Sequence, residues 1–378
     1  MYEKILIRYG ELTLKGKNRD SFIAQLARNI KLITGEYPET KYDRMLLTYS
    51  DANLEKLQYV FGITSYSPVI FCENNLEKIT NSAIKLVNKD DKTFKISARR
   101  NNKKFELTSA EINQKVGASV LKHYPLIKVD VHNPECNINI EVRSDKTYLF
   151  SKTYEALGGL PVGISGSTLH LMSGGIDSPV AAFNLMKRGL KVSFLSFISP
   201  PQTDEKTIGK IKDLVSVLSK YQGKSHLYLA NYSKLMNYIS FTSNESYRIN
   251  LMRRSFYRIA SKFAKSKNIM VLSNGENLGQ VASQTIESLS TIASASELLI
   301  LRPLIANDKV ETINIAKQIK TYDISIEKAK ETCELFAPKN PVTKPNLATA
   351  LRLEEELTQL KDLEEELLAN EIEHYTIE

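Results

Sequence analysis

The chain of 378 residues contains no tryptophan and only three cysteines, and the scarcity of cysteine restricts its chemistry. Cys72, Cys136 and Cys333 are odd in number and far apart, which argues against a disulfide framework and against zinc sites of the CxxC type. The five histidines are scattered as well, so no metal-ligand spacing is present. Any cysteine with a chemical role therefore acts as a single thiol.

Long apolar runs are also missing. No stretch of about 18 apolar residues occurs, and the first residues, MYEKILIRYGE, carry charges where a signal peptide needs apolar side chains. With 42% hydrophobic and 25% charged residues, the composition is typical of a soluble globular protein. We therefore expect a cytoplasmic protein, and its length predicts two or three domains.

Acidic residues are scarce in most of the chain, although the net charge is only +8. Residues 346–378 hold ten acids and two bases, which leaves residues 1–345 with a net charge of +16. Such a basic body favours a polyanionic partner, and nucleic acid comes before membrane because no basic amphipathic anchor is evident. From charge alone, a merely lysine-rich surface is an equal alternative.

The most informative segment is Leu169 to Ser178, which reads LHLMSGGIDS. It predicts a buried strand, a sharp turn at Gly174 and Gly175, and a helix opened by Ser178 as N-cap and by Pro179. The free amide groups of such a turn converge at the positive end of the helix dipole. The segment therefore predicts an anion site.

This loop differs from a Walker A motif because no Lys-Ser or Lys-Thr pair follows the glycines. Asp177 instead places a carboxylate at the mouth of the loop, where it could hold Mg²⁺ against a triphosphate. The sequence SGGIDS resembles the PP-loop of ATP pyrophosphatases, which cleave ATP to AMP and pyrophosphate. The alternative is an ordinary glycine-containing turn between a strand and a helix.

The patterns along the chain divide it into an α+β first half and an α/β second half. We expect units at 1–54, 55–157 and 169–345, a linker or flexible lid at 158–168 and an acidic helix at 346–378. In the first half we expect strands at 4–16 and 41–50, helices at 18–32, 76–87 and 109–123, and a hairpin turning at 144–146.

In the second half, strands and helices alternate in the manner of a parallel sheet. The expected strands lie at 170–172, 191–198, 226–231 and 269–273, and the later helices at 204–221, 245–267 and 308–320. Ligands of open parallel sheets bind at the carboxyl ends of the strands. The polar segments 173–178, 196–197 and 273–276 lie at such ends.

The order of motifs over nearly the whole chain resembles the tRNA 4-thiouridine synthetases, or tRNA sulfurtransferases, in the short form without a rhodanese domain. The matching segments are IRYGELTLKGKNR at 7–19, VDVHNP at 129–134, GGLPVG at 158–163, SGGIDSPVAA at 173–182, MRR at 252–254, GENLGQVASQT at 275–285, RPLI at 302–305 and TYDIS at 321–325.

The resemblance implies a ferredoxin-like domain, a THUMP domain for RNA and a PP-loop ATP pyrophosphatase domain, in that order. It also implies conversion of uridine 8 in tRNA to 4-thiouridine, with a cysteine desulfurase as donor of persulfide sulfur. In many bacteria such proteins supply sulfur to the thiazole of thiamine, and some relatives form homodimers.

The resemblance also assigns ATP contacts. Besides Ser173, Gly174, Gly175 and Ser178 of the loop, the matching positions are Leu171, Met172, Ser196, Phe197, Arg253, Gly275 and Gln284. Phe197 could stack on adenine, Arg253 could bind phosphate through two of its guanidinium nitrogens or contact tRNA, and Gly275 would allow close backbone approach. Ser196 replaces the histidine expected there, so only backbone contacts are expected from it.

Cys333 aligns with the family's cysteine, where a thiolate or persulfide could carry sulfur. Thr332 precedes it, so the cysteine doublet of some relatives is absent, and Cys72 and Cys136 are expected to be structural. The expected contacts with the tRNA backbone are the basic residues Lys15, Lys17, Arg19, Arg99, Arg100, Lys103 and Lys104.

Two other classes of function are compatible with these sequence features. One is a PP-loop ligase or amidotransferase that acts on a small molecule, although the basic first half argues against it. The other is an RNA-binding protein whose nucleotide site only regulates. Asp177 as catalytic residue and Mg²⁺ ligand, ATP as cosubstrate and tRNA as substrate form the favoured interpretation.

Overall fold

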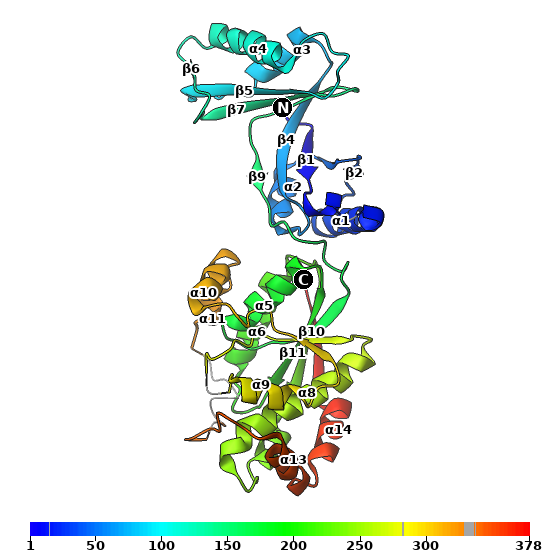
Figure 1. Ribbon diagram of the computed structural model, residues 1–378, viewed down its shortest axis with the longest axis vertical. Helices are drawn as coiled ribbons and strands as arrows, with labels where there is room; N and C mark the ends of the chain where they lie inside the picture. The colour runs from blue at the N-terminus through cyan, green and yellow to red at the C-terminus, as the bar shows by residue number, and fades with distance from the viewer. Residues whose placement is uncertain (15, 282, 329–335, 337) are drawn as a thin grey trace. The chain divides into compact units, whose positions relative to one another are not determined.

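The computed structural model describes residues 1–378 except 15, 282, 329–335 and 337 (Figure 1). The chain forms two compact units, Met1–Gly159 and Leu160–Glu378. No helix among the described residues has the length and apolar character needed to cross a lipid bilayer. Each unit has its own sheet and its own core, and the two are described separately.

The first unit is built on a nine-stranded sheet. Its strands are β1 (Lys4–Arg8), β2 (Glu39–Thr40), β3 (Arg44–Thr48), β4 (Ser65–Cys72), β5 (Thr93–Arg100), β6 (Lys128–Val129), β7 (Cys136–Val142), β8 (Thr147–Phe150) and β9 (Tyr154–Glu155). Its α-helices are α1 (Arg19–Thr34), α2 (Asp51–Lys56), α3 (Leu76–Ile84) and α4 (Ser109–His123). The strand order is β2-β3-β1-β4-β8-β7-β5-β6, and β9 pairs with β4.

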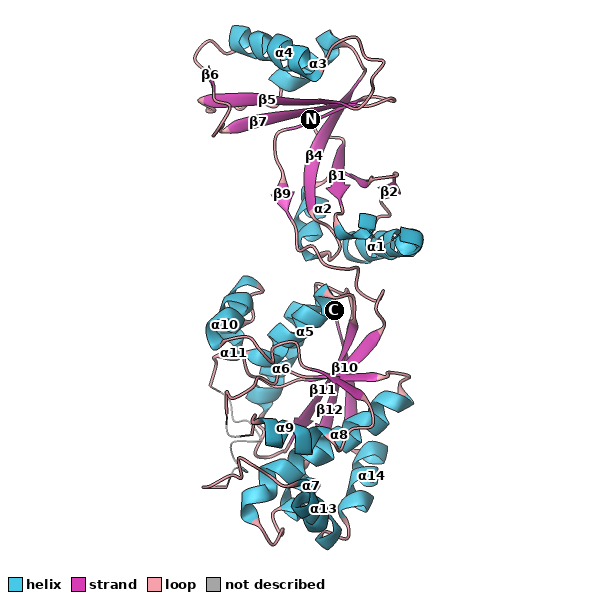
Figure 2. Cartoon of the chain, in the orientation of Figure 1, coloured by secondary structure: helices cyan, strands magenta, loops and turns pink. Residues whose placement is uncertain are grey.

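Strand β4 joins the two halves of this sheet. Its first residues pair with β1, from Ser65 opposite Arg8 to Val69 opposite Lys4, whereas Ile70 to Cys72 pair with β8. Helices α3 and α4 cover the β5 and β7 end of the sheet (Figure 2). A capping box between Thr108 and Glu111 sets the start of α4, which begins and ends as predicted.

The second unit contains a six-stranded sheet in the order β14-β13-β10-β11-β12-β15. Its strands are β10 (Ser167–Leu171), β11 (Lys191–Ile198), β12 (Ser225–Asn231), β13 (Val271–Ser273), β14 (Leu299–Leu301) and β15 (Ile372–Ile377). Its helices are α5 (Asp177–Lys187), α6 (Glu205–Ser219), α7 (Ser233–Ile239), α8 (Arg248–Ser266), α9 (Ile286–Ala293), α10 (Lys309–Gln318), α11 (Tyr322–Ser325), α13 (Leu347–Glu356) and α14 (Leu360–Asn370).

The strands from β10 to β14 are parallel, as predicted, and only β15 runs antiparallel, against β12. The chain leaves β10 for β11 on one side and later returns to β13 on the other side. The carboxyl end of β10 is therefore the point where the strand order reverses, the usual ligand site of such sheets.

Two expectations about local structure are wrong. The first strand ends at Arg8, and short 3₁₀ helices follow at Glu11–Leu14 and Gly16–Asn18. The acidic segment is not one helix, because α13 and α14 are followed by β15. Of the two alternatives for 158–168, a linker or a flexible lid, the structure contradicts the lid, since the amide of Leu160 donates to Lys187 at the end of α5 and that of Gly163 donates to Gly189.

The acidic helices pack against the basic helix α8. Arg254 of α8 pairs with Glu354 of α13, and Arg258 pairs with Glu354 and with Glu364 of α14. Leu353 and Leu360 join the apolar core of the second unit. The negative charge of this segment therefore neutralises arginines of the same unit.

Candidate functional site

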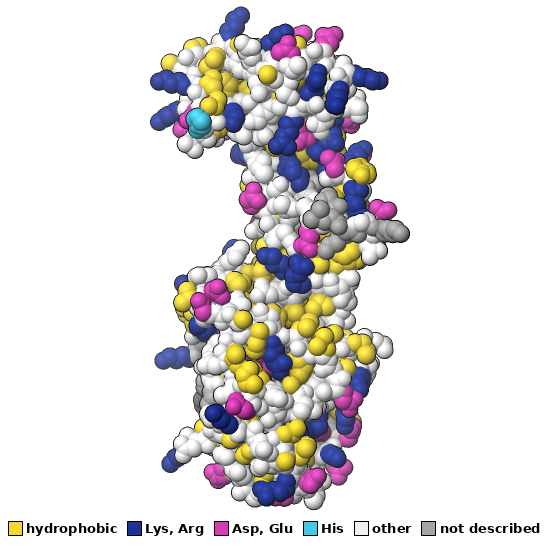
Figure 3. All heavy atoms as spheres, in the orientation of Figure 1, with side chains coloured by type: hydrophobic (Ala, Val, Ile, Leu, Met, Phe, Trp, Pro, Cys, Tyr) yellow, Lys and Arg dark blue, Asp and Glu magenta, His cyan; other side chains and the backbone are white. Residues whose placement is uncertain are grey.

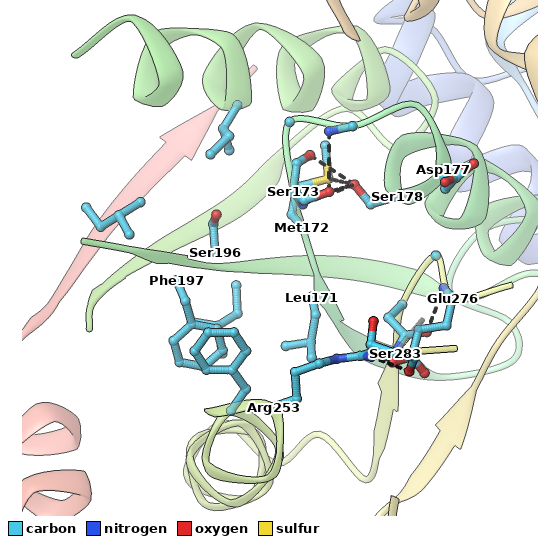
Figure 4. Close-up of a pocket in the computed structure, with 18 of the residues that line it drawn as sticks. Leu171, Met172, Ser173, Asp177, Ser178, Ser196, Phe197, Arg253, Glu276 and Ser283 are labelled. Atoms are coloured by element: carbon cyan, nitrogen blue, oxygen red, sulfur yellow. Dashed lines mark hydrogen bonds and ion pairs between the residues drawn. The ribbon is translucent and has the colours of Figure 1, made fainter. Parts of the chain in front are cut away.

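A cavity of about 450 Å³ opens at the carboxyl ends of β10, β11 and β13 (Figure 4). The loop after β10 forms one side, the segment after β13 a second, and α8 a third. All twelve residues that the sequence assigned to ATP or Mg²⁺ line it: Leu171, Met172, Ser173, Gly174, Gly175, Asp177, Ser178, Ser196, Phe197, Arg253, Gly275 and Gln284. The fold thus brings together positions that are more than a hundred residues apart.

The hydroxyl of Ser178 fixes the shape of the glycine loop. Its Oγ accepts a hydrogen bond from the Ser173 amide at 3.0 Å and donates to the Ser173 carbonyl at 2.9 Å. Helix α5 begins at Asp177 with Ile176 at the N-cap position, so the prediction of Ser178 as N-cap is wrong. Ser178 lies in the first turn of α5, and its hydroxyl binds the backbone of Ser173, so it links the helix to the start of the glycine loop.

A buried histidine on β10 binds the residue that follows this loop. His170 Nε2 lies 2.9 Å from the Ser178 carbonyl oxygen, and Nδ1 lies 3.0 Å from Ser273 Oγ. A carbonyl can only accept, so Nε2 carries the proton and Nδ1 accepts from the serine. Burial lowers the pKa of His170 to about 4, which keeps the ring neutral near pH 7.

Asp177 forms an ion pair at the mouth of the cavity. Lys309 Nζ lies 2.7 Å from one carboxylate oxygen and 2.9 Å from the other, and Gln280 Nε2 donates to the second at 2.9 Å. A role for Lys309 was not predicted from the sequence, because no residue near the glycine loop indicates that a cation from α10 lies beside it. The capping box of Asp308 and Glu311 was the local signal that Lys309 begins a helix.

Gly275 lies where the segment after β13 touches the start of α5. A Cβ atom at this position would lie 2.7 Å from the Asp177 carbonyl carbon and 2.7 Å from the Ser178 nitrogen. These are backbone atoms that cannot move aside without opening the loop. Gly275 therefore allows a close approach to the glycine loop, and its expected contact with ATP stays a prediction.

Aromatic rings form the apolar wall of the cavity. Phe197 stacks on Phe256 of α8 with ring centroids 4.0 Å apart, and it meets the Tyr232 ring edge to face. One face of the Phe197 ring is thus already covered, and Phe256 joins it in lining the cavity. Ser196 is buried, which suits the expectation that it offers only its backbone.

Arg253 extends from α8 to a buried carboxylate. It forms an ion pair with Glu276, and its second terminal nitrogen donates to the Ser283 carbonyl at 2.9 Å (Figure 4). Arg302 binds the other oxygen of Glu276 at 2.6 Å. Glu276 belongs to the motif GENLGQVASQT, from which neither a role nor a partner for this carboxylate was predicted.

Gln284 offers an unused acceptor in the cavity wall. Its Oε1 atom is buried and has no hydrogen-bond partner among the described residues. Leaving such an atom unsatisfied is costly. The amino group of adenine or a ribose hydroxyl is the kind of donor that would satisfy it.

The cysteines fall into two groups. Cys333 lies outside the described residues, so its proposed role as sulfur carrier stays a prediction. Burial raises the pKa of Cys72 to about 11 and that of Cys136 to about 12. Both are therefore protonated at neutral pH, which fits the structural role expected of them.

The basic residues expected at the RNA surface belong to the first unit. Lys15 lies outside the described residues; Arg99, Lys103 and Lys104 are exposed at and after the end of β5. Arg19 and Arg100 instead donate to the carbonyls of Tyr42 and Phe105.

Figure 3 shows Lys and Arg side chains over much of the visible face of the first unit. Sequence reasoning missed a partly buried arginine group in the sheet, in which Arg44 binds Asp43 and Glu141. Arg143 also pairs with Asp43, and hydrogen bonding to Arg44 holds the pKa of Asp43 at about 2.

The sequence matches three known family models. The model described as thiamine biosynthesis protein (ThiI) matches residues 163–359, the ThiI ferredoxin-like domain matches residues 4–67, and the THUMP domain matches residues 73–152. The predicted kinds of domain and their order are confirmed.

Curated relatives and a solved structure match over the whole chain. A probable tRNA sulfurtransferase of Mycoplasmopsis agalactiae is 99% identical, and one of Mycoplasmopsis synoviae is 57% identical, each with 100% of both chains covered. The crystal structure of a 4-thiouridine synthetase in complex with RNA and ATP superposes with a TM-score of 0.94 at 35% identity, again with 100% of both chains covered.

Proposed function

Because this chain belongs to the ThiI family of tRNA sulfurtransferases, we propose that it uses ATP to transfer sulfur to uridine 8 of tRNA, giving 4-thiouridine. The observation that carries the proposal is the cavity at the carboxyl end of β10, where the glycine loop, Arg253 and Gln284 face one space. The basic first unit supplies the surface for a polyanionic substrate.

The proposed nucleotide site uses both apolar and polar walls. Adenine packs against the apolar wall around Phe197, and Gln284 Oε1 accepts a hydrogen bond from the nucleotide. The phosphates lie at the glycine loop beside the start of α5, where the helix dipole favours negative charge. Lys309 and Arg253 add positive charge on two sides of the phosphates.

Asp177 is the proposed protein ligand of Mg²⁺. Its carboxylate lies at the mouth of the cavity, and the described residues contain no group of three His, Cys, Asp or Glu that could cage a metal. This donor set fits Mg²⁺, which is usually bound by one or two carboxylates together with substrate phosphates. When bound, Mg²⁺ supplies further neutralisation of phosphate charge.

The proposed reaction has two steps. The uracil O4 attacks the α-phosphorus of ATP, and pyrophosphate leaves with its charge stabilised by the loop amides and Lys309. The outer sulfur of a persulfide then attacks C4 of the adenylated uracil, and AMP leaves. We assign the persulfide to Cys333, loaded by a cysteine desulfurase, and an external thiol then frees the product by reducing the disulfide link.

Pyrophosphate release with tRNA as the variable component tests this proposal. We expect release that requires both ATP and tRNA, and 4-thiouridine when a desulfurase and cysteine are added. A small-molecule ligase would release pyrophosphate without tRNA. An RNA-binding protein with a regulatory nucleotide site would release none. A homodimer is a separate proposal, to be tested by the mass of the protein in solution.

A further inference from the structure

The carboxylate of Glu276 lies at the centre of a buried network in the wall of the nucleotide cavity. Only 5% of its side chain is exposed, and it contacts two arginines that are themselves mostly buried. Arg253 binds Oε1, and Arg302 Nε binds Oε2 at 2.6 Å. Three charges in contact carry a net charge of +1, so this wall remains attractive to phosphate.

Two neutral side chains extend this network, one bound to the carboxylate and one bound to the Glu276 backbone amide. The Tyr257 hydroxyl donates to Oε2 at 3.3 Å and accepts from the Asn274 side chain, whose oxygen in turn accepts from the Glu276 amide at 3.0 Å. Burial raises the pKa of Tyr257, so its hydroxyl is a protonated donor at neutral pH. The network draws on α8, the end of β13 and the residue after β14.

We propose that Glu276 is a positioning residue for the ATP reaction, because it holds the Arg253 guanidinium at the cavity wall before the nucleotide binds. Arg302 is the anchor on the far side, since it binds the same carboxylate without lining the cavity. Ser283 fixes the other terminal nitrogen of Arg253. The guanidinium therefore has one orientation. The conformational entropy of the Arg253 side chain is lost when the protein folds, so the nucleotide does not have to order this side chain when it binds.

This inference rests on the assignment of Arg253 as an ATP contact. In the full-length protein, Glu276→Gln keeps the shape of the side chain but removes the charge that orients Arg253. We expect the kcat for tRNA-dependent pyrophosphate release to fall about 10- to 100-fold, because misplacement by about 1 Å costs that much. The KM for ATP should change by less than about threefold, because the wall keeps its positive charge.

A matched control is available because a second buried carboxylate also binds an arginine of α8. Glu364 is equally buried and binds Arg258 of α8 at 2.7 Å, but it does not line the cavity. Both Glu364→Gln and Glu276→Gln should lower the melting temperature, but Glu364→Gln should leave kcat and KM within about twofold of wild type. An equal loss of kcat in both variants would overturn the proposal, because the effect would belong to α8 in general.

A double variant separates orientation from charge balance. Glu276→Gln combined with Arg302→Met restores the net charge of +1, yet leaves Arg253 without its partner. We expect kcat to stay low, whereas recovery to wild type would overturn the proposal. If Glu276→Gln alone does not fold, this charge-balanced variant carries the test.

Arg253→Met distinguishes the ATP contact of Arg253 from the positioning role of Glu276. Wild-type kinetics in Arg253→Met would reject the ATP contact itself. Impaired Arg253→Met together with wild-type Glu276→Gln would reject only the positioning role.

Discussion

Lys309 and Asp177 form an ion pair that joins the first residues of two helices, α10 and α5, across 132 positions of sequence. The lysine contacts both carboxylate oxygens. In a Walker A loop the lysine follows the glycines directly. Here the glycine loop contains no lysine, and a cation reaches its mouth from a distant helix instead.

Lys309→Met should lower tRNA-dependent pyrophosphate release by about 100-fold, the usual cost of losing one group that stabilises a developing negative charge. The initial rate at saturating ATP is the measurement. Lys317→Met is the matched control, since Lys317 is exposed in the last turn of the same helix and lies over the Tyr322 ring. Equal rates in the two variants would remove Lys309 from the reaction.

Asp177→Ala should abolish pyrophosphate release while tRNA binding persists. The carboxylate lies at the nucleotide cavity, whereas the basic residues expected to bind RNA belong to the other unit. Pyrophosphate release and filter binding of tRNA report the two activities separately. If a folded variant lost both, this division of labour between the units would be wrong.

A fragment of residues 1–165 should bind tRNA, and its affinity should fall steeply between roughly 50 and 200 mM salt because phosphate contacts release counterions. Replacing Arg99, Lys103 and Lys104 by Gln should make the slope of log K against log salt shallower by roughly one unit per lost contact. Replacing Lys85, Lys89 and Lys92 in the same unit gives a charge-matched comparison. Binding that ignores salt would contradict phosphate contacts as its basis.

Cys333→Ser should still form AMP and pyrophosphate with tRNA and ATP, but should make no 4-thiouridine when a desulfurase is the donor. Free sulfide should restore the product, because it replaces the carried sulfur as nucleophile. Mass analysis of nucleosides provides the measurement. Cys72→Ser and Cys136→Ser serve as controls, and full thiolation by Cys333→Ser would make that cysteine structural.

The stability of the second unit should fall as the pH is lowered from 6.5 to about 4. His170 is held neutral in the fold, with a pKa of about 4, but titrates near 6.5 when unfolded. In this window the unfolded chain binds more protons, so the free energy of unfolding decreases with decreasing pH, by roughly 3 kcal/mol in total.

Urea unfolding at several pH values measures this effect. His170→Gln keeps a donor for the Ser178 carbonyl and should flatten the curve over this range. An unchanged slope in the variant would assign the pH dependence to other groups.

Much of the nucleotide site could be predicted from the sequence because its motifs follow strands directly. The glycine loop after β10, Phe197 near the end of β11 and Gly275 after β13 all lie at carboxyl ends of parallel strands, which one sheet brings together. Periodicity also predicted α4 and β11 at their observed bounds. The kinds of domain followed from the order of motifs.

What could not be predicted depends on contacts between distant segments. The pairing of Asp177 with Lys309 and of Glu276 with Arg302 is decided by how helices and strands pack, and no local pattern encodes it. The acidic segment was misread because charge dominates its composition. Its last strand alternates only weakly between buried and exposed residues.

Strand β15 covers the edge of β12 with residues that come about 150 positions later in the chain, as the pair His226 and His374 illustrates. Until that pairing forms, β12 presents open backbone groups along a largely apolar strand, SHLYLAN. Open edges of this kind are templates for aggregation, and contacts of such long range form slowly. A variant that lacks 372–377 should therefore lose soluble yield, even though every residue of the nucleotide cavity remains.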